Sequence, residues 1–166
     1  VTPISDNYVL SDETTAIAEI LEYKNHGGSA IVDVTSIGLK RDPLALRRVS
    51  ESTGVHIIMG TGYYQRVYHP EDMDKRTVED LTETIVKDVV DGVYDTGIRS
   101  GIIGEIGING DPLITNELKS MRAAARASRL TGAPICIHLG GKGAEKHAIL
   151  DIVADEGVDL SRVILG

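Results

Sequence analysis

The sequence predicts an α/β fold, part of a (β/α)8 (TIM) barrel, from three observations. Short apolar segments rich in Ile and Val alternate with longer segments of helical spacing, which is the pattern of βα units around a parallel sheet. The short segments are almost continuously apolar, as is typical of parallel strands covered on both faces. No glycine-rich phosphate-binding motif follows the first of them, which disfavours a doubly wound dinucleotide-binding sheet, the other architecture with this order.

Five strands are expected, each short, rich in β-branched residues and flanked by glycine or proline. They cover residues 29–35, 55–61, 101–106, 134–139 and 162–165. A complete barrel of this type needs about 250 residues. Here a helix precedes the first strand, and nothing follows the last strand to cover it. We therefore expect residues 1–166 to be an internal segment of a single, longer hydrolase barrel domain, with about strands 2 to 6 of the eight.

Five helices are expected before and between these strands. They cover about 12–26, 42–54, 77–97, 115–132 and 144–156. The second begins with the N-cap Asp42 and a first-turn proline, and Thr77 and Thr115 are the expected N-caps of the third and fourth. A stripe of apolar residues at four-residue steps continues the third helix as far as Gly97. Each helix ends at or just before a glycine, the residue that most readily closes a helix.

Composition excludes several classes of protein. Lys and Arg number 17 against 25 Asp and Glu, a net charge of −8, which disfavours binding to the phosphates of nucleic acid. No apolar run approaches the roughly 20 residues that span a bilayer, and the first residues do not form a signal segment. The one cysteine, Cys136, cannot form an intrachain disulfide. We expect a cytoplasmic protein that binds a small molecule and neither nucleic acid nor membrane.

Two polar side chains stand at the ends of otherwise apolar strands, where the active sites of parallel barrels lie. Glu105 ends the third strand and His138 the fourth, and the side-chain period of two places both on the inward faces. A carboxylate and an imidazole on adjacent strands are what a metal centre would use. The alternative is structural, with Glu105 in a salt bridge and His138 hydrogen-bonded in the core. A buried carboxylate is costly without a cation or strong donor, so the two residues together favour a metal more than either alone.

Other polar residues near the strand ends keep both a functional and a structural interpretation. Asp33 either orients a ligand of the site or accepts hydrogen bonds from loop amides. Tyr64 either lines a pocket or is an ordinary loop aromatic, and Lys142 either binds an anion or is solvated. Cys136 is expected to be a packed thiol. Surface or packing roles are expected for the remaining histidines, which are His26, His56, His69 and His147.

Further stretches of the chain form a specific set when taken in order, although each is short. They are residues 31–35, 41–43, 60–64, 95–103, 123–128, 131–132 and 161–166. With them, almost the whole chain resembles the phosphotriesterase-like family of the amidohydrolase superfamily. Glu105 stands where phosphotriesterases proper carry a carboxylated lysine, so the likeness is to the phosphotriesterase-homology branch.

The resemblance implies a hydrolase with two divalent metal ions, zinc or else manganese or cobalt. The ions would share a hydroxide that attacks a lactone, a carboxylic ester or a phosphotriester, with the first two favoured. Glu105 maps onto the catalytic residue that bridges both metals, His138 onto a metal ligand and Tyr64 onto the aromatic residue that lines the substrate pocket. The other ligands map outside this chain: a His-x-His pair, a histidine one residue beyond Gly166, and an aspartate on strand eight.

Two further expectations follow from the resemblance. The 166 residues alone should be inactive, because most of the metal ligands lie elsewhere. The whole protein should hydrolyse ester bonds. A homodimer is one oligomeric state that the sequence leaves open. The alternative that stays open is a phosphotriesterase-related protein that binds a ligand without turnover.

Overall fold

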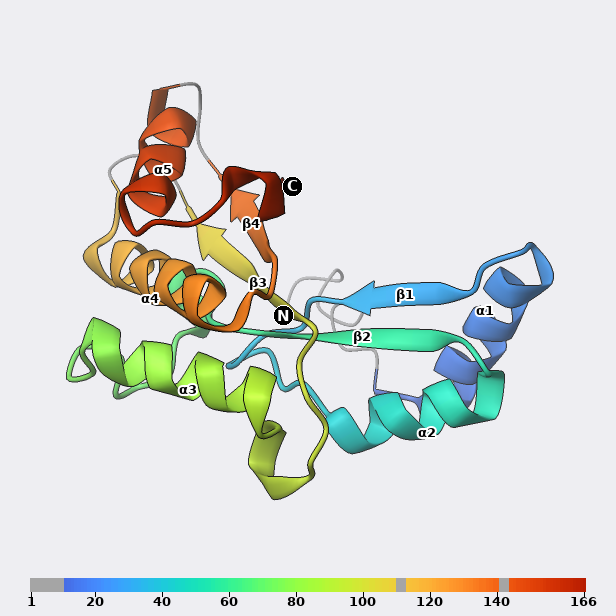
Figure 1. Cartoon of the computed structure of the whole chain (residues 1–166). Coiled ribbons are helices and arrows are strands. Elements are labelled where there is room, and N and C mark those ends of the chain that lie inside the picture. Colours follow the sequence, from blue (N-terminus) through green and yellow to red (C-terminus); the bar gives the residue numbers. More distant parts are fainter. Residues whose placement is uncertain (1–10, 110–112, 141–143) are drawn as a thin grey trace, which may run out of the picture.

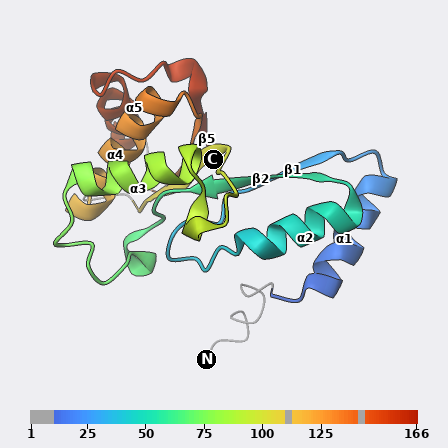
Figure 2. The same ribbon diagram turned by 60° about the horizontal axis from the view of Figure 1, so that its bottom comes forward.

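The structure, a computed structural model, describes residues 11–109, 113–140 and 144–166. In this part of the chain five parallel strands lie in the order β1-β2-β3-β4-β5, and a helix lies between each strand and the next. Strands β1 and β2 extend to one end of the molecule beside α1 and α2, whereas α3, α4 and α5 lie together at the other end, where α4 packs against β3 and β4 (Figures 1 and 2). This is the α/β part-barrel that the sequence predicts.

The order of the long elements is also the predicted one. The helices are α1 (Glu13–Asn25), α2 (Pro43–Thr53), α3 (Val78–Val90), α4 (Thr115–Thr131) and α5 (Ala144–Asp155). The strands are β1 (Ala30–Asp33), β2 (His56–Thr61), β3 (Ile102–Ile108), β4 (Ile135–Leu139) and β5 (Val163–Leu165). Among the described residues, the short 3₁₀ turns are η2 (Arg66–Tyr68), η3 (Val93–Asp95) and η4 (Leu160–Arg162).

Capping side chains begin α2 and α3 as predicted. The carboxylate of Asp42 accepts a 3.0 Å hydrogen bond from the N–H of Ala45, and a proline follows Asp42 at the first helical position. Thr77 and Asp80 form a reciprocal capping box at the start of α3. Gly54 ends α2 in the left-handed conformation, with a φ of 68°.

Two helix boundaries differ from the prediction. Helix α3 ends at Val90, not at Gly97, because Gly92 takes a φ of +118° and turns the chain out of the helix; Val93 is still buried, but in η3. Thr115 is not the N-cap of α4. Ile114 occupies that position without a side-chain hydrogen bond, and Thr115 is the first helical residue.

Two strand ends also differ. Strand β1 stops at Asp33 because the Asp33 carboxylate accepts a 2.8 Å hydrogen bond from the N–H of Thr35 and turns the chain there. Strand β3 continues to Ile108, so Glu105 lies inside β3 and not at its end, which corrects the sequence-based placement. The register of β3 against β4 shifts between Ile103 and Ile106, and the Gly104–Glu105 peptide bond in this stretch is cis.

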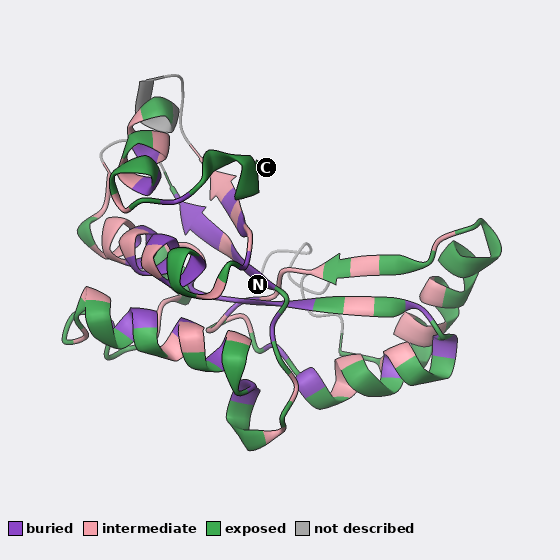
Figure 3. Cartoon of the chain, in the orientation of Figure 1, coloured by how far each residue is buried: buried purple, intermediate pink, exposed green. Residues whose placement is uncertain are grey.

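The core lies between β3, β4 and the helices that cover them (Figure 3). Alanines on the inner face of α4 are fully buried, and their small side chains let α4 pack closely against α3 and β3. The large side chains around them are also fully buried, and each contributes roughly 1.5–3 kcal/mol by leaving water. They include Leu81, Ile85, Ile103, Ile106, Met121, Ile135 and Ile137.

The β1–β2 end of the sheet is less covered. Val32 is 48% exposed and Ile58 is 39% exposed, in contrast to the buried β3 and β4 (Figure 3). Among the helices that the structure describes, none combines the length and the apolar character that crossing a membrane requires.

Candidate functional site

Glu105 and His138, the two residues singled out from the sequence, lie side by side. The Oε1 atom of Glu105 is 3.5 Å from Nδ1 of His138, and their side chains are 24% and 39% exposed. Strand pairing explains why the two side chains are close. Gly107 lies opposite His138 in the β3–β4 ladder, and Glu105 is two residues before Gly107 on β3, a spacing that places both on the same face of the strand. Each side chain has one face in the protein and one face open.

The chemistry and the spacing of this pair fit two of the ligands of a divalent metal ion. Imidazole nitrogen and carboxylate oxygen are ordinary ligands of zinc, and two donors on one tetrahedral ion with bonds of ~2.0–2.1 Å lie about 3.4 Å apart. Within residues 11–109, 113–140 and 144–166, no group of three or more His, Cys, Asp or Glu side chains is arranged to hold a metal. The described part of the chain thus supplies a pair of donors and not a complete coordination shell.

The backbone of Glu105 is held by the end of β1. Its N–H donates a 3.0 Å hydrogen bond to the carbonyl of Val34. The absence of a side chain at Gly60 makes this contact possible, because a Cβ there would lie 2.2 Å from the carbonyl oxygen of Gly104 and 3.1 Å from Cα of Val34. Strand β2 therefore lets the strands on either side of it meet at the site.

A buried polar cluster of Arg41, Thr61, Asp88 and Ser100, which sequence reasoning did not identify, adjoins Gly60. Nη2 of Arg41 and Oγ1 of Thr61 each lie 2.6 Å from Oδ2 of Asp88. Nη1 of Arg41 and Oγ of Ser100 also donate to the Gly60 carbonyl, each at 3.2 Å. The cluster fixes the backbone on which Glu105 rests.

Tyr64 lies against the pair. Its ring centroid is 5.1 Å from that of His138 and 5.6 Å from that of Tyr68, both in tilted geometry. Burial, and then the negative charge of Glu105, raise the pKa of the Tyr64 phenol. The hydroxyl therefore keeps its proton at neutral pH and can donate a hydrogen bond.

The loop that carries Tyr64 is fastened at two points. Nε2 of His69 lies 2.7 Å from the carbonyl oxygen of Tyr64, and burial lowers the pKa of this imidazole. The fully buried Glu117 accepts hydrogen bonds from the N–H of Arg66 at 3.0 Å and from the N–H of Asn109 at 2.8 Å. Glu117 was not predicted; its one sequence signal is an acidic residue in the first turn of a helix.

The other candidates take the structural roles that were open to them. Asp33 accepts from a loop amide, and Cys136 is half-buried with a thiol whose pKa is raised by burial and then by Glu105. His26 hydrogen-bonds the carbonyl of Glu22, and His69 packs edge-on to Tyr63. His56 and His147 are exposed. Lys142 lies outside the described residues.

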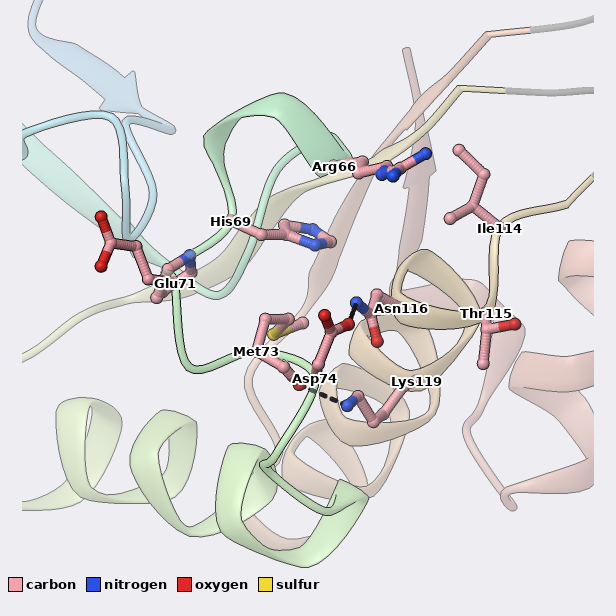
Figure 4. A pocket seen from close by; sticks show the side chains of 10 residues that line it. Arg66, His69, Glu71, Met73, Asp74, Ile114, Thr115, Asn116 and Lys119 are labelled. Carbon is pink, nitrogen blue, oxygen red and sulfur yellow. Dashed lines mark hydrogen bonds between the residues drawn. The ribbon is translucent and has the colours of Figure 1, made fainter.

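A cavity of about 580 Å³ lies outside this group, between the loop after β2 and the start of α4. Figure 4 shows Arg66 and His69 in the upper part of the view and Asp74, Asn116 and Lys119 together below them. Asn116 hydrogen-bonds Asp74, and Lys119 donates to the carbonyl of Met73, so these groups are largely paired within the protein. Tyr64, Glu105 and His138 do not line this cavity, which is therefore separate from the metal-binding candidate.

Comparison with known proteins gives curated relatives named as hydrolases. The chain is 41% identical to an N-acetyltaurine hydrolase of Dictyostelium discoideum over 160 residues and 38% identical to that of Homo sapiens over 161 residues. Each match covers 96% of this chain but only 43% and 46% of the relatives. The chain thus spans less than half the length of these curated relatives.

Solved structures of similar proteins have the same arrangement. A resiniferatoxin-binding protein from Rhodobacter sphaeroides has a TM-score of 0.90 at 42% identity, over 94% of this chain and 43% of that one. The phosphotriesterase homology protein from Escherichia coli, crystallised with phosphate in its active site, has a TM-score of 0.90 at 29% identity, over 96% and 55%. A lactonase from Listeria monocytogenes has a TM-score of 0.86 at 25% identity, over 96% and 53%.

The sequence profile of the Phosphotriesterase family matches residues 4–166, almost the whole chain. This match agrees with the named relatives and with the parallel half-barrel described above, and the chain belongs to the Phosphotriesterase family.

Proposed function

We propose that the full-length protein is a metal-dependent hydrolase that cleaves a lactone, a carboxylic ester or an N-acyl amide. The observation that carries the proposal is the 3.5 Å approach of Glu105 and His138 on adjacent strands of a Phosphotriesterase-family chain. The names of the relatives support the substrate range, since they include N-acetyltaurine hydrolases and a lactonase. Phosphotriesters are a further substrate class, which the assays below include.

In this proposal each residue of the site has a separate task. Glu105 and His138 would be ligands of the two divalent ions, Glu105 as the shared ligand and His138 as a ligand of one ion. When bound, the ions would activate water at neutral pH and polarise the bond that is attacked. Tyr64 excludes water from one side and offers its hydroxyl to a polar atom of the substrate. Val34 and Gly60 hold Glu105 in place through the backbone.

Replacement of Glu105 by glutamine tests the proposal, because glutamine keeps the shape of the side chain and removes its charge. In the full-length protein, Glu105→Gln should lose metal, measured by elemental analysis, and should lose more than about 100-fold in hydrolysis, since even partners outside the metal shell cost 10–100-fold. Glu51→Gln, on the exposed side of α2, is the matched control and should retain both. Full metal occupancy in Glu105→Gln would exclude Glu105 as a metal ligand.

Turnover separates hydrolysis from binding alone. The substrates to assay are γ-butyrolactone, methyl butyrate, N-acetyltaurine and a phosphotriester, each with added Zn²⁺ or Mn²⁺ and after chelation. Activity that chelation abolishes supports the hydrolase. If the metal-loaded protein turns over none of the four, the result would instead favour a protein that binds a ligand without cleaving it. The Rhodobacter sphaeroides relative is named as a binding protein.

A further inference from the structure

Three aromatic rings form a row that leads outward from the candidate metal site. The ring of His138 is 5.1 Å from that of Tyr64, and Tyr64 is 5.6 Å from Tyr68. Tyr64 is half-buried, whereas Tyr68 is 43% exposed and its neighbour Val67 is 78% exposed. The row therefore begins at a metal-ligand candidate and ends on an open apolar surface.

The segment that carries Tyr64 and Tyr68 is held in one conformation. His69 hydrogen-bonds the carbonyl of Tyr64, and the N–H of Tyr68 donates 2.9 Å to the carbonyl of Gln65. Glu117 holds the N–H of Arg66 from the other side. A surface that is already ordered loses little entropy when a ligand binds.

The loop after β1 supports the same segment from below. A Cβ on Gly38 would lie 1.9 Å from the carbonyl oxygen of Tyr68, so only a glycine lets this loop pack so closely against η2. Tyr68 is thus positioned by the loops after two different strands. Its ring, which is 43% exposed, remains accessible to a ligand.

We propose that Tyr68 is a specificity-determining residue: with Tyr64 and Val67 it forms an aromatic wall that contacts the part of the substrate remote from the cleaved bond. This inference rests on the proposed function and narrows it. The wall consists of two phenol rings and an aliphatic side chain. It should favour substrates whose remote part is flat and apolar, since stacked rings attract each other beyond the area they bury.

Two esters that differ in a remote phenyl group test the wall. Methyl butyrate and methyl 4-phenylbutyrate share the cleaved bond and the leaving group, so the ratio of their kcat/KM values reports the contact with the phenyl ring. In the full-length protein, Tyr68→Ala should lower kcat/KM for the phenyl ester about three- to tenfold and leave methyl butyrate within about twofold. Tyr68→Phe should keep the ratio of the unaltered protein, because it keeps the ring.

Tyr23→Ala is the matched control, since Tyr23 on α1 is also 43% exposed and lies on the first helix, away from the site. It should leave the ratio unchanged. An equal loss of kcat/KM for both esters in Tyr68→Ala would show that Tyr68 acts by supporting the loop, and unchanged kcat/KM for both esters would show that it does not contact the substrate. Either result overturns the inference.

A second measurement does not depend on turnover. Dissociation constants for butyrate and 4-phenylbutyrate, measured by calorimetry on the metal-loaded protein, report the same contact through the acid products. Selective weakening of 4-phenylbutyrate binding in Tyr68→Ala supports the wall even if neither ester is cleaved. The hydrolase proposal fails separately, if the metal-loaded protein turns over none of the four substrates named above. Equal affinities of both acids for the unaltered protein and for Tyr68→Ala would overturn the wall, whatever the esters show.

Discussion

The N–H of Glu105 on β3 donates a 3.0 Å hydrogen bond to the carbonyl of Val34, just beyond the end of β1. Strand β2 lies between these two strands in the sheet, and Gly60 is the point at which they meet across it. The position of the proposed metal-bridging carboxylate therefore depends on a residue that has no side chain.

Gly60→Ala should disturb the site through this contact. The new Cβ would lie 2.2 Å from the carbonyl oxygen of Gly104, a backbone atom that cannot turn aside. Overpacking of this kind costs typically about 1–3 kcal/mol. We expect a lower free energy of unfolding in urea, together with weaker metal binding, because Glu105 must move with Gly104.

Gly101→Ala is the control for this substitution. Its Cβ would lie 2.8 Å from the Cγ2 methyl group of Ile58, a side-chain atom of a residue that is 39% exposed and can shift toward solvent, unlike a backbone oxygen. It should cost less stability and leave metal binding in place. If both variants bind metal like the unaltered protein, the Val34–Glu105 contact does not position the carboxylate.

Much of this site could be predicted because parallel strands repeat a simple rule. Polar residues at strand ends meet at one edge of the sheet, and this rule correctly brought Glu105 and His138 together. The exact place of Glu105 could not be predicted. It depends on a register shift between β3 and β4, which arises from pairing with a distant segment and leaves no local sequence signal.

The buried acids Asp88 and Glu117 were missed for a related reason. Both stand on helices, where an acidic side chain usually faces water. Whether such a residue is buried depends on which loops fold over it, and here the Arg41 guanidinium covers Asp88 and two backbone amides cover Glu117. Propensity and periodicity describe the helix itself but not these distant partners.

Asp88→Ala should be strongly destabilising. It removes the partner of Arg41 inside the protein, where the two side chains are 2% and 9% exposed, and it also leaves the Thr61 hydroxyl unpaired. Breaking a buried ion pair by removing one partner costs about 3–5 kcal/mol. Urea unfolding measures the loss. Glu13→Ala breaks the exposed Glu13–Arg48 pair and should have little effect; equal losses in the two variants would contradict the role given to the buried cluster.

Glu117→Gln should loosen the loop after β2, at Arg66, and the chain just after β3, at Asn109. Each carboxylate oxygen accepts one backbone N–H, whereas glutamine offers one oxygen and turns an NH₂ group toward the other donor. An unsatisfied buried donor costs about 1–3 kcal/mol. Amide hydrogen exchange should quicken at Arg66, Asn109 or both. Glu83→Gln, on the exposed side of α3, is the control, and unchanged exchange at both amides in Glu117→Gln would rule out the fastening role.

His69 should make stability depend on pH in a defined direction. Burial lowers the pKa of its imidazole below the ordinary histidine value of 6.5, against the smaller opposing effect of its hydrogen bond to Tyr64. At pH values above 6.5 the ring is neutral in the folded and the unfolded protein. As the pH falls below 6.5, the unfolded chain takes up a proton before the folded one, so stability is lost until the folded pKa is passed.

His69→Gln isolates this contribution, because the glutamine NH₂ group can take the place of Nε2 and donate to the same carbonyl of Tyr64. Free energies of unfolding in urea, measured between about pH 5 and 7.5, should fall less steeply with decreasing pH in His69→Gln than in the unaltered protein, since one histidine fewer is protonated on unfolding. The two proteins should therefore differ in slope across this range. Parallel curves would mean that His69 titrates equally in the folded and unfolded states, and that its burial beneath the Tyr64 loop does not hold it neutral.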